Sequence, residues 1–163
     1  MTPDELEKLR IAAAQSSHKD EGEFAKAVNR AAVDSGIEAI KAILLINGGS
    51  AVAMLAFVGT LATKAQAPVH FAPALTIFAV GVFFAVSAAG AGYFTNLSIA
   101  NASNYLKREY QEPFLRDTPK SKQHAGIGEV CRWLSVLFAG LGIGCFLLGV
   151  VFAYAAFGKL AAL

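Results

Sequence analysis

Two stretches of the chain, residues 71–95 and 133–158, contain no Asp, Glu, Lys or Arg. A third stretch, residues 42–63, is also free of charge and has Asn47 as its only strongly polar side chain. The hydrocarbon core of a bilayer is about 30 Å thick and takes roughly 20 helical residues to cross. The sequence therefore predicts an all-α, polytopic membrane protein with three transmembrane helices at these positions.

Composition agrees with this fold class and excludes several functions. Of the 163 residues, 55% are apolar and only 16% are charged, which is unusual for a water-soluble domain. Lys and Arg number 14 against 12 Asp and Glu, a balance that does not suit nucleic-acid binding. The two cysteines and three histidines are too scattered for a zinc or haem site. We expect the lipid bilayer as the first partner, no nucleic acid, no metal and no cofactor.

The distribution of Lys and Arg predicts the orientation of the helices. Segments 1–41 and 96–132 hold twelve of these residues, whereas segments 64–70 and 159–163 hold one each. Because cytoplasmic flanks retain positive charge, the two rich segments are expected in the cytoplasm. The short loop 64–70 and the C-terminal residues 159–163 are then extracytoplasmic, and we expect a bacterial inner membrane.

The cytoplasmic flanks are expected to be largely helical. Thr2-Pro3-Asp4-Glu5 is typical of a helix start, which predicts a short amphipathic helix to about Gln15. Ser16 to His18 interrupt the pattern. A second helix is expected to begin at Asp20, in the cytoplasmic segment 1–41, and to continue into the first transmembrane helix.

Loop 64–70 is short enough to make the first two spans antiparallel neighbours, with cytoplasmic extensions that pair as a helical hairpin. The second extension should end near Pro113, because a residue before proline leaves helical geometry. Residues 116–123, with Pro119, are expected to form an exposed loop.

Small residues and one amide are the candidate packing sites within the spans. Small side chains let helix backbones approach each other in lipid. They are Gly48 and Gly49 in the first span, Ala88 and Gly92 in the second, and Gly140 and Gly144 in the third, which form a GxxxG pattern. These residues predict a helix-packing or oligomer interface. Asn47 is expected to make an interhelical hydrogen bond, with a polar lining of a pathway as the alternative.

The start of the third span carries a second feature. Glu129 and Arg132 lie beside Trp133, the single tryptophan of the chain, and predict an ion pair next to an aromatic membrane anchor, with Arg132 and Trp133 at the interface. No catalytic motif and no charged residue lies within the spans. The sequence therefore predicts no catalytic residues and disfavours an enzyme or a transporter, which needs titratable groups at depth.

Two functional hypotheses remain from the sequence. The first is a small non-enzymatic membrane protein that serves as an accessory subunit of a larger membrane complex or as a homo-oligomeric scaffold. The alternative is an oligomeric pore-forming or membrane-disrupting effector, of the kind used in phage lysis or in defence against phage.

Overall fold

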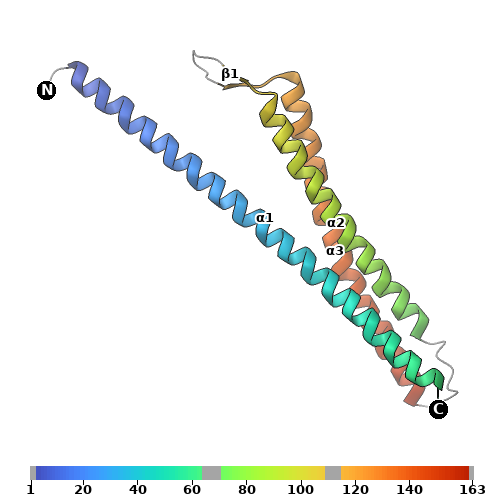
Figure 1. Ribbon diagram of the computed structural model, residues 1–163. Helices are drawn as coiled ribbons and strands as arrows, with labels where there is room; N and C mark the ends of the chain where they lie inside the picture. Colours follow the sequence, from blue (N-terminus) through green and yellow to red (C-terminus); the bar gives the residue numbers. More distant parts are fainter. Residues whose placement is uncertain (1–2, 64–70, 109–114, 162–163) are drawn as a thin grey trace. The chain divides into compact units, whose positions relative to one another are not determined.

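The computed structural model describes residues 3–63, 71–108 and 115–161, and these residues are helical apart from one short strand pair (Figure 1). The elements are α1 (Pro3–Thr63), α2 (Ala72–Asn104), β1 (Lys107–Arg108), β2 (Leu115–Arg116) and α3 (Pro119–Ala161). Three helical segments are long and apolar enough to cross a membrane: Arg30–Ala62, Ala72–Asn104 and Pro119–Lys159. The predicted all-α fold with three candidate membrane helices is confirmed at this level, and the predicted loop 64–70 lies outside the described residues.

The predicted interruption of the N-terminal helix is wrong, because α1 is one continuous helix of 61 residues. Ser16, Ser17 and His18 lie inside it. Serine and histidine cost only a few tenths of a kcal/mol each in a helix, and the three residues include no proline or glycine to stop one. The chain forms two units, Met1–Ala39 and Ile40–Leu163, whose boundary falls within α1.

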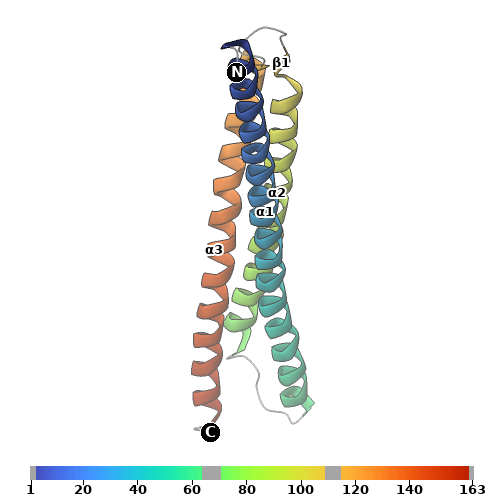
Figure 2. The ribbon, with the colours of Figure 1, turned by 90° about the vertical axis from the view of Figure 1, so that its left-hand side faces the viewer.

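The well-defined hairpin of the second unit is made by α2 and α3, which run antiparallel and contact each other (Figures 1 and 2). At the end where they are joined, β1 and β2 pair antiparallel, with Lys107 opposite Arg116. The sequence predicted paired extensions for the first two spans. At this end the structure shows α2 paired with α3, and the pairing of the first two extensions stays a prediction.

Both ends of this connection differ from the prediction. Helix α2 ends at Asn104 rather than near Pro113, and the Tyr105 N–H donates to the Asn101 carbonyl at 3.1 Å. Helix α3 begins at Pro119, inside the loop predicted for residues 116–123. Thr118 caps it, since its Oγ1 accepts from the Ser121 N–H at 3.1 Å, and proline suits the first position of a helix because its missing N–H has no partner there.

Small side chains recur every seven residues along the contact between α2 and α3. On α2 the buried positions of this repeat are Ala74, Gly81, Ala88, Thr95 and Ala102; on α3 the repeat is Ser121, Gly128, Ser135, Gly142, Gly149 and Ala156. A seven-residue repeat keeps one face of a helix against its neighbour along its whole length. We call the contact between these two rows the α2–α3 seam.

The largest hydrophobic cluster lies away from the β1–β2 end of the hairpin, where the last part of α1 joins the other two helices. Its buried members are Met54, Leu61, Phe71, Ala74, Phe78 and Ala156. The rings of Phe57, Phe71 and Phe157 form a triangle with centroids 5.0–5.4 Å apart. One aromatic ring thus comes from each span or its boundary.

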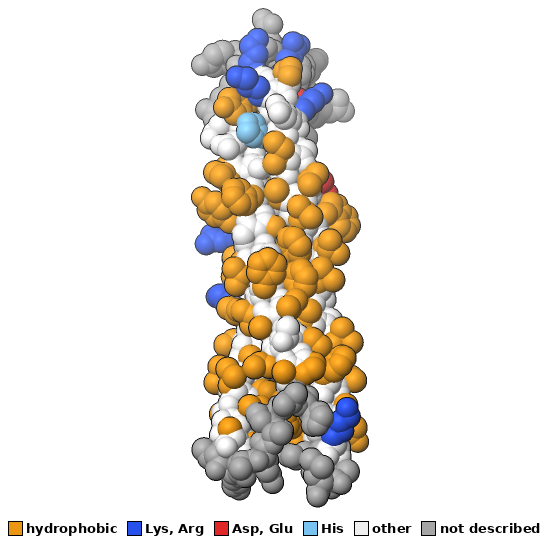
Figure 3. Space-filling view, turned by 90° about the vertical axis from the view of Figure 1, so that its right-hand side faces the viewer, with side chains coloured by type: hydrophobic (Ala, Val, Ile, Leu, Met, Phe, Trp, Pro, Cys, Tyr) orange, Lys and Arg blue, Asp and Glu red, His pale blue; other side chains and the backbone are white. Residues whose placement is uncertain are grey.

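Most of the apolar surface nevertheless faces outward. In the most apolar 18-residue window of each candidate span, only 17%, 28% and 11% of the residues are buried. On the face drawn in Figure 3, hydrophobic side chains spread over much of the described surface and basic side chains gather at the β1–β2 end. A lipid environment accounts for such a surface, because a soluble monomer does not leave apolar patches of this extent in water.

Candidate functional site

The candidate site is built around Asn47, a polar residue whose side chain is completely buried. Its Nδ2 donates to the Ile43 carbonyl at 3.0 Å, within α1, and to the Gly142 carbonyl of α3 at 3.1 Å. The first bond holds the amide against its own helix, and the second joins α1 to α3. Asn47 therefore connects two helices by a side-chain to backbone hydrogen bond, which is favourable where water is excluded.

Two glycines make room for this amide. A Cβ atom on Gly81 of α2 would overlap Oδ1 of Asn47 and lie 2.5 Å from its Cγ. A Cβ atom on Gly142 would lie 2.8 Å from Ile43 Cγ2 and 3.5 Å from the Gly81 carbonyl oxygen. The distance from a Cβ at Gly81 to Asn47, and from a Cβ at Gly142 to Ile43, is shorter than van der Waals contact. Only glycine therefore fits at Gly81 without displacement of a neighbour. We call Asn47, Gly81 and Gly142 the amide node.

The second polar atom of the amide is held differently. Among the described residues, Oδ1 of Asn47 has no hydrogen-bond partner. The Cα–H of Gly81 that takes the place of a Cβ points at this oxygen, as the overlap of the substituted Cβ requires. A Cα–H···O contact is weaker than an N–H···O bond and recurs where helices approach closely. At this level Asn47 of α1 therefore contacts both Gly81 of α2 and Gly142 of α3.

The other small residues predicted from the sequence fall into two groups. Gly48 lies 3.8 Å, measured from a substituted Cβ, from Val82 Cγ2. The Ala88 carbonyl accepts a hydrogen bond from Ser135 Oγ at 2.8 Å. A Cβ on Gly92 would lie 3.7 Å from Ser135 Oγ. These three residues lie at helix contacts within the chain.

Gly49, Gly140 and Gly144 form the second group. A Cβ atom on any of them would meet no described atom within 4 Å, so the GxxxG pattern of α3 faces outward. The glycines of α3 that pack within the chain are Gly128, Gly142 and Gly149, and none of them was predicted from the sequence. The signal that identifies them is the seven-residue repeat of small side chains from Ser121 to Ala156.

The predicted ion pair beside Trp133 is present. The Arg132 guanidinium lies 2.6 Å from Glu129 Oε1, and Trp133 Nε1 donates to the same oxygen at 3.0 Å. The Arg132 guanidinium also lies over the indole ring, 6.0 Å from its centroid. All three side chains are exposed, so this cluster adds little to stability but fixes the orientation of the indole.

The β1–β2 end carries a further cluster. Thr118 Oγ1 donates to the Tyr105 carbonyl at 2.8 Å, which ties the end of α2 to the start of α3. The rings of Tyr105 and His124 stack with centroids 5.2 Å apart and an interplanar angle of 6°. Lys120 Nζ lies 5.6 Å from the centroid of the Tyr105 ring. These contacts close the hairpin outside its most apolar part.

In the part of the chain that the structure describes, no three His, Cys, Asp or Glu side chains come together as a metal ion would need. No protein-family model matches the chain, and no curated protein or solved structure matches it either. The amide node is the described feature in which all three helices meet around a buried polar side chain.

Proposed function

We propose that the chain is a non-enzymatic structural protein of a membrane, acting as a homo-oligomeric scaffold or as an accessory subunit of a larger membrane complex. The observation that carries the proposal is the amide node. Its only polar side chain is held by backbone carbonyls and a glycine Cα–H. Such a group holds helices in place, whereas proton transfer or ion transport needs groups that titrate or coordinate at depth.

The outward faces support the same proposal. Gly49, Gly140 and Gly144 lie where no described atom packs against them, and small residues on a lipid-facing helix favour close approach of another helix. Exposed apolar side chains surround them, such as Leu45 at 71% and Val151 at 62%. Lipid can cover these side chains, and so can a second copy or a larger subunit.

Native mass measurement after purification in a mild detergent tests this proposal. Stoichiometric co-purification of other polypeptides supports the accessory role, and a defined number of identical chains supports the scaffold. A monomer under all mild conditions would contradict both. Gly140→Leu and Gly144→Leu should weaken the assembly, whereas Gly36→Leu is a matched control because its Cβ also meets no described atom within 4 Å.

The pore-forming alternative gives a different result in planar bilayers. Asn47 lies in close contact with Gly81 and Gly142 at the amide node, so we expect any conductance to require a lumen between several chains. We expect the reconstituted protein to give no discrete conductance steps. Reproducible steps that change with Asn47→Asp would favour the pore over the scaffold.

The proposal includes the orientation predicted from the Lys and Arg residues, with the N-terminus in the cytoplasm of a bacterium and the C-terminus outside. Reporter fusions after Gln15, Lys64, Lys120 and Leu163 should report inside, outside, inside and outside. The same side for Gln15 and Leu163 would contradict the three-span topology, since an odd number of crossings separates the two ends.

A further inference from the structure

The length of α3 raises the question of where the bilayer lies along it. Helix α3 contains 43 residues, and at ~1.5 Å per residue it is about twice as long as the ~30 Å hydrocarbon core is thick. Only part of it can therefore lie in lipid. Aromatic side chains that face outward, and the contacts that set residues of α2 and α3 at one level, indicate which part.

One boundary is marked by Tyr93 of α2 and Trp133 of α3, which are 63% and 64% exposed. They lie at the same level, because Ser135 of α3 bonds to the Ala88 carbonyl and approaches Gly92. Trp133 is oriented by Glu129 and Arg132. Tyr and Trp with one polar atom are enriched where lipid meets water. We call Tyr93 and Trp133 the near belt.

The other boundary is marked by Tyr154, which is 80% exposed, and by Phe157, whose ring packs on Phe71 at 5.2 Å. We call Tyr154 and Phe157 the far belt. From Trp133, α3 rises ~32 Å to Tyr154 and ~36 Å to Phe157, and from Tyr93 to Phe71, which packs on Phe157, the rise is about 33 Å. These spacings are close to the ~30 Å thickness of the hydrocarbon core.

We propose that the bilayer lies between the near belt and the far belt, with the amide node near its middle and with the β1–β2 end of the hairpin projecting into water. Gly142 lies ~14 Å from Trp133 and ~18 Å from Tyr154 along α3. The inference rests on the membrane-spanning part of the proposed function and is independent of the scaffold or accessory role.

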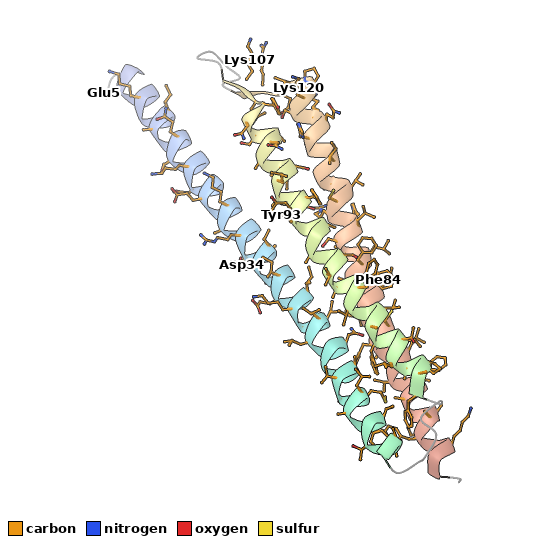
Figure 4. The ribbon with its side chains drawn as sticks, turned by 45° about the vertical axis from the view of Figure 1, so that its right-hand side comes forward. Glu5, Asp34, Phe84, Tyr93, Lys107 and Lys120 are labelled. Carbon is orange, nitrogen blue, oxygen red and sulfur yellow. The ribbon has the colours of Figure 1, made fainter. Side chains whose placement is uncertain are left out.

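The seam changes character at the near belt, as this placement requires. Beyond it, α3 continues toward Pro119 for about 21 Å. The seam residues there include the buried polar side chains Thr95 and Ser121, and Ser98 beside the seam is also buried. Between the belts the seam residues are Ala, Gly and one serine bonded to a carbonyl. Figure 4 shows Phe84 and Tyr93 at successive levels of α2, and Lys107 and Lys120 at the end of the hairpin.

One charged residue sets a limit on the placement. Lys41 precedes Asn47 by six residues, and it therefore lies ~9 Å from the amide node along α1, within the lipid region. A lysine side chain can extend its apolar stem toward the boundary and place its ammonium group there. Lys41 is exposed, and the near belt lies only ~5 Å farther along the helices, within the reach of a lysine side chain.

Quenching of tryptophan fluorescence by brominated lipids tests the proposal, because Trp133 is the only tryptophan of the chain. The full-length protein is reconstituted into phosphatidylcholine vesicles brominated either near the headgroup or deep in the acyl chain. Two variants carry Trp133→Phe together with one new tryptophan. Ile143→Trp places it between the belts, and Ile127→Trp places it beyond the near belt; both positions are about half exposed.

We expect greater loss of fluorescence from shallow bromine for Trp133 and from deep bromine for Ile143→Trp. The Ile127→Trp variant should lose no fluorescence with either lipid and should be quenched by iodide in water. Strong quenching of the Ile127→Trp variant by either lipid, or the reverse depth order for the other two, would overturn the belts and leave the membrane-spanning assignment standing. No quenching of any variant by brominated lipid would contradict both the belts and the membrane-spanning assignment.

Discussion

The two ends of the α2–α3 hairpin differ in the side chains that pack against the seam glycines. At the far-belt end, the seam glycine Gly149 faces the ring of Phe78, which is 2% exposed. At the β1–β2 end, the seam glycine Gly128 faces Ile99, which is 51% exposed, and the backbone near Thr95. One seven-residue repeat therefore has a rigid, fully buried partner at one end and a movable partner at the other.

The difference shows that a glycine on the seam is not equally constrained along its length. A Cβ on Gly149 would lie 2.5 Å from Phe78 Cε1, whereas a Cβ on Gly128 would lie 3.3 Å from Ile99 Cγ1. A buried ring cannot move without disturbing its other contacts, but a half-exposed isoleucine can change its rotamer. The stability lost when a seam glycine is substituted should therefore depend on whether the side chain that it contacts can move.

The largest effect is expected at the amide node, where the three helices meet. Gly81→Leu places side-chain atoms on Oδ1 of Asn47 and forces α1 away from α2. We expect it to lower the free energy of unfolding by about 3 kcal/mol, at the upper end of the cost of overpacking. Reversible unfolding in mixed micelles by increasing SDS measures it.

Gly90→Leu is the matched control for this substitution. It lies on the same helix, and its Cβ would meet no described atom within 4 Å, so it should change the free energy of unfolding by less than about 1 kcal/mol. Equal losses for Gly81→Leu and Gly90→Leu would mean that α1 does not pack at the amide node.

The comparison between the two hairpin ends is tested by Gly149→Ala and Gly128→Ala. We expect losses of about 2 kcal/mol for the first and less than about 1 kcal/mol for the second, because only the first methyl group meets a rigid ring. Phe78→Leu in the Gly149→Ala background should recover part of the loss. Equal costs at both ends, or no recovery, would show that the ring does not set the constraint.

Asn47→Leu removes the hydrogen bond to Gly142 and keeps a side chain of similar size. We expect a loss of about 1 kcal/mol, the usual range for a side-chain hydrogen bond between membrane helices. The value stays small because the substitution also removes the unpartnered Oδ1. The SDS titration measures this loss. An unchanged unfolding midpoint would mean that the hydrogen bond of Asn47 does not stabilise the amide node and that the close packing at Gly81 and Gly142 does.

The smallest effect is expected at the β1–β2 end. Thr118→Val removes both the cap of α3 and the bond to the Tyr105 carbonyl. Because Thr118 is partly exposed, we expect a loss of about 0.5 kcal/mol, at the low end for a lost helix cap. Amide exchange of Ser121 and Lys122 should accelerate while exchange at Gly142 stays the same. Faster exchange along all of α3 would show that this end controls the whole hairpin.

Much of the fold could be predicted from the sequence, because uncharged stretches of the required length leave few alternatives. The errors occurred where local signals were weak or misread. Ser16 to His18 suggested a break, although no residue there prevents a helix. Thr118 and Pro119 repeat the start signal of Thr2 and Pro3, but in a polar segment they were interpreted as a loop.

The candidate site could be predicted only in part. Asn47 was identifiable as the one strongly polar side chain within a span, since burial of an amide in lipid requires a partner. That partner is a backbone carbonyl on α3, which a sequence pattern does not reveal. Gly81 and Gly142 gain their role from their contact with Asn47 across the chain, whereas the GxxxG pattern of Gly140 and Gly144 points outward.

Helices α2 and α3 keep one antiparallel register from the membrane into the β1–β2 end. An engineered disulfide tests it most directly. A Cβ on Gly128 would lie 3.4 Å from Ser98 Cβ, close to the separation in a disulfide. In full-length protein with Cys131→Ser and Cys145→Ser, the pair Ser98→Cys and Gly128→Cys should oxidise within one chain. The pair Ser98→Cys and Gly126→Cys should remain reduced. Equal oxidation of both pairs, or bridges only between chains, would contradict this register of α2 and α3.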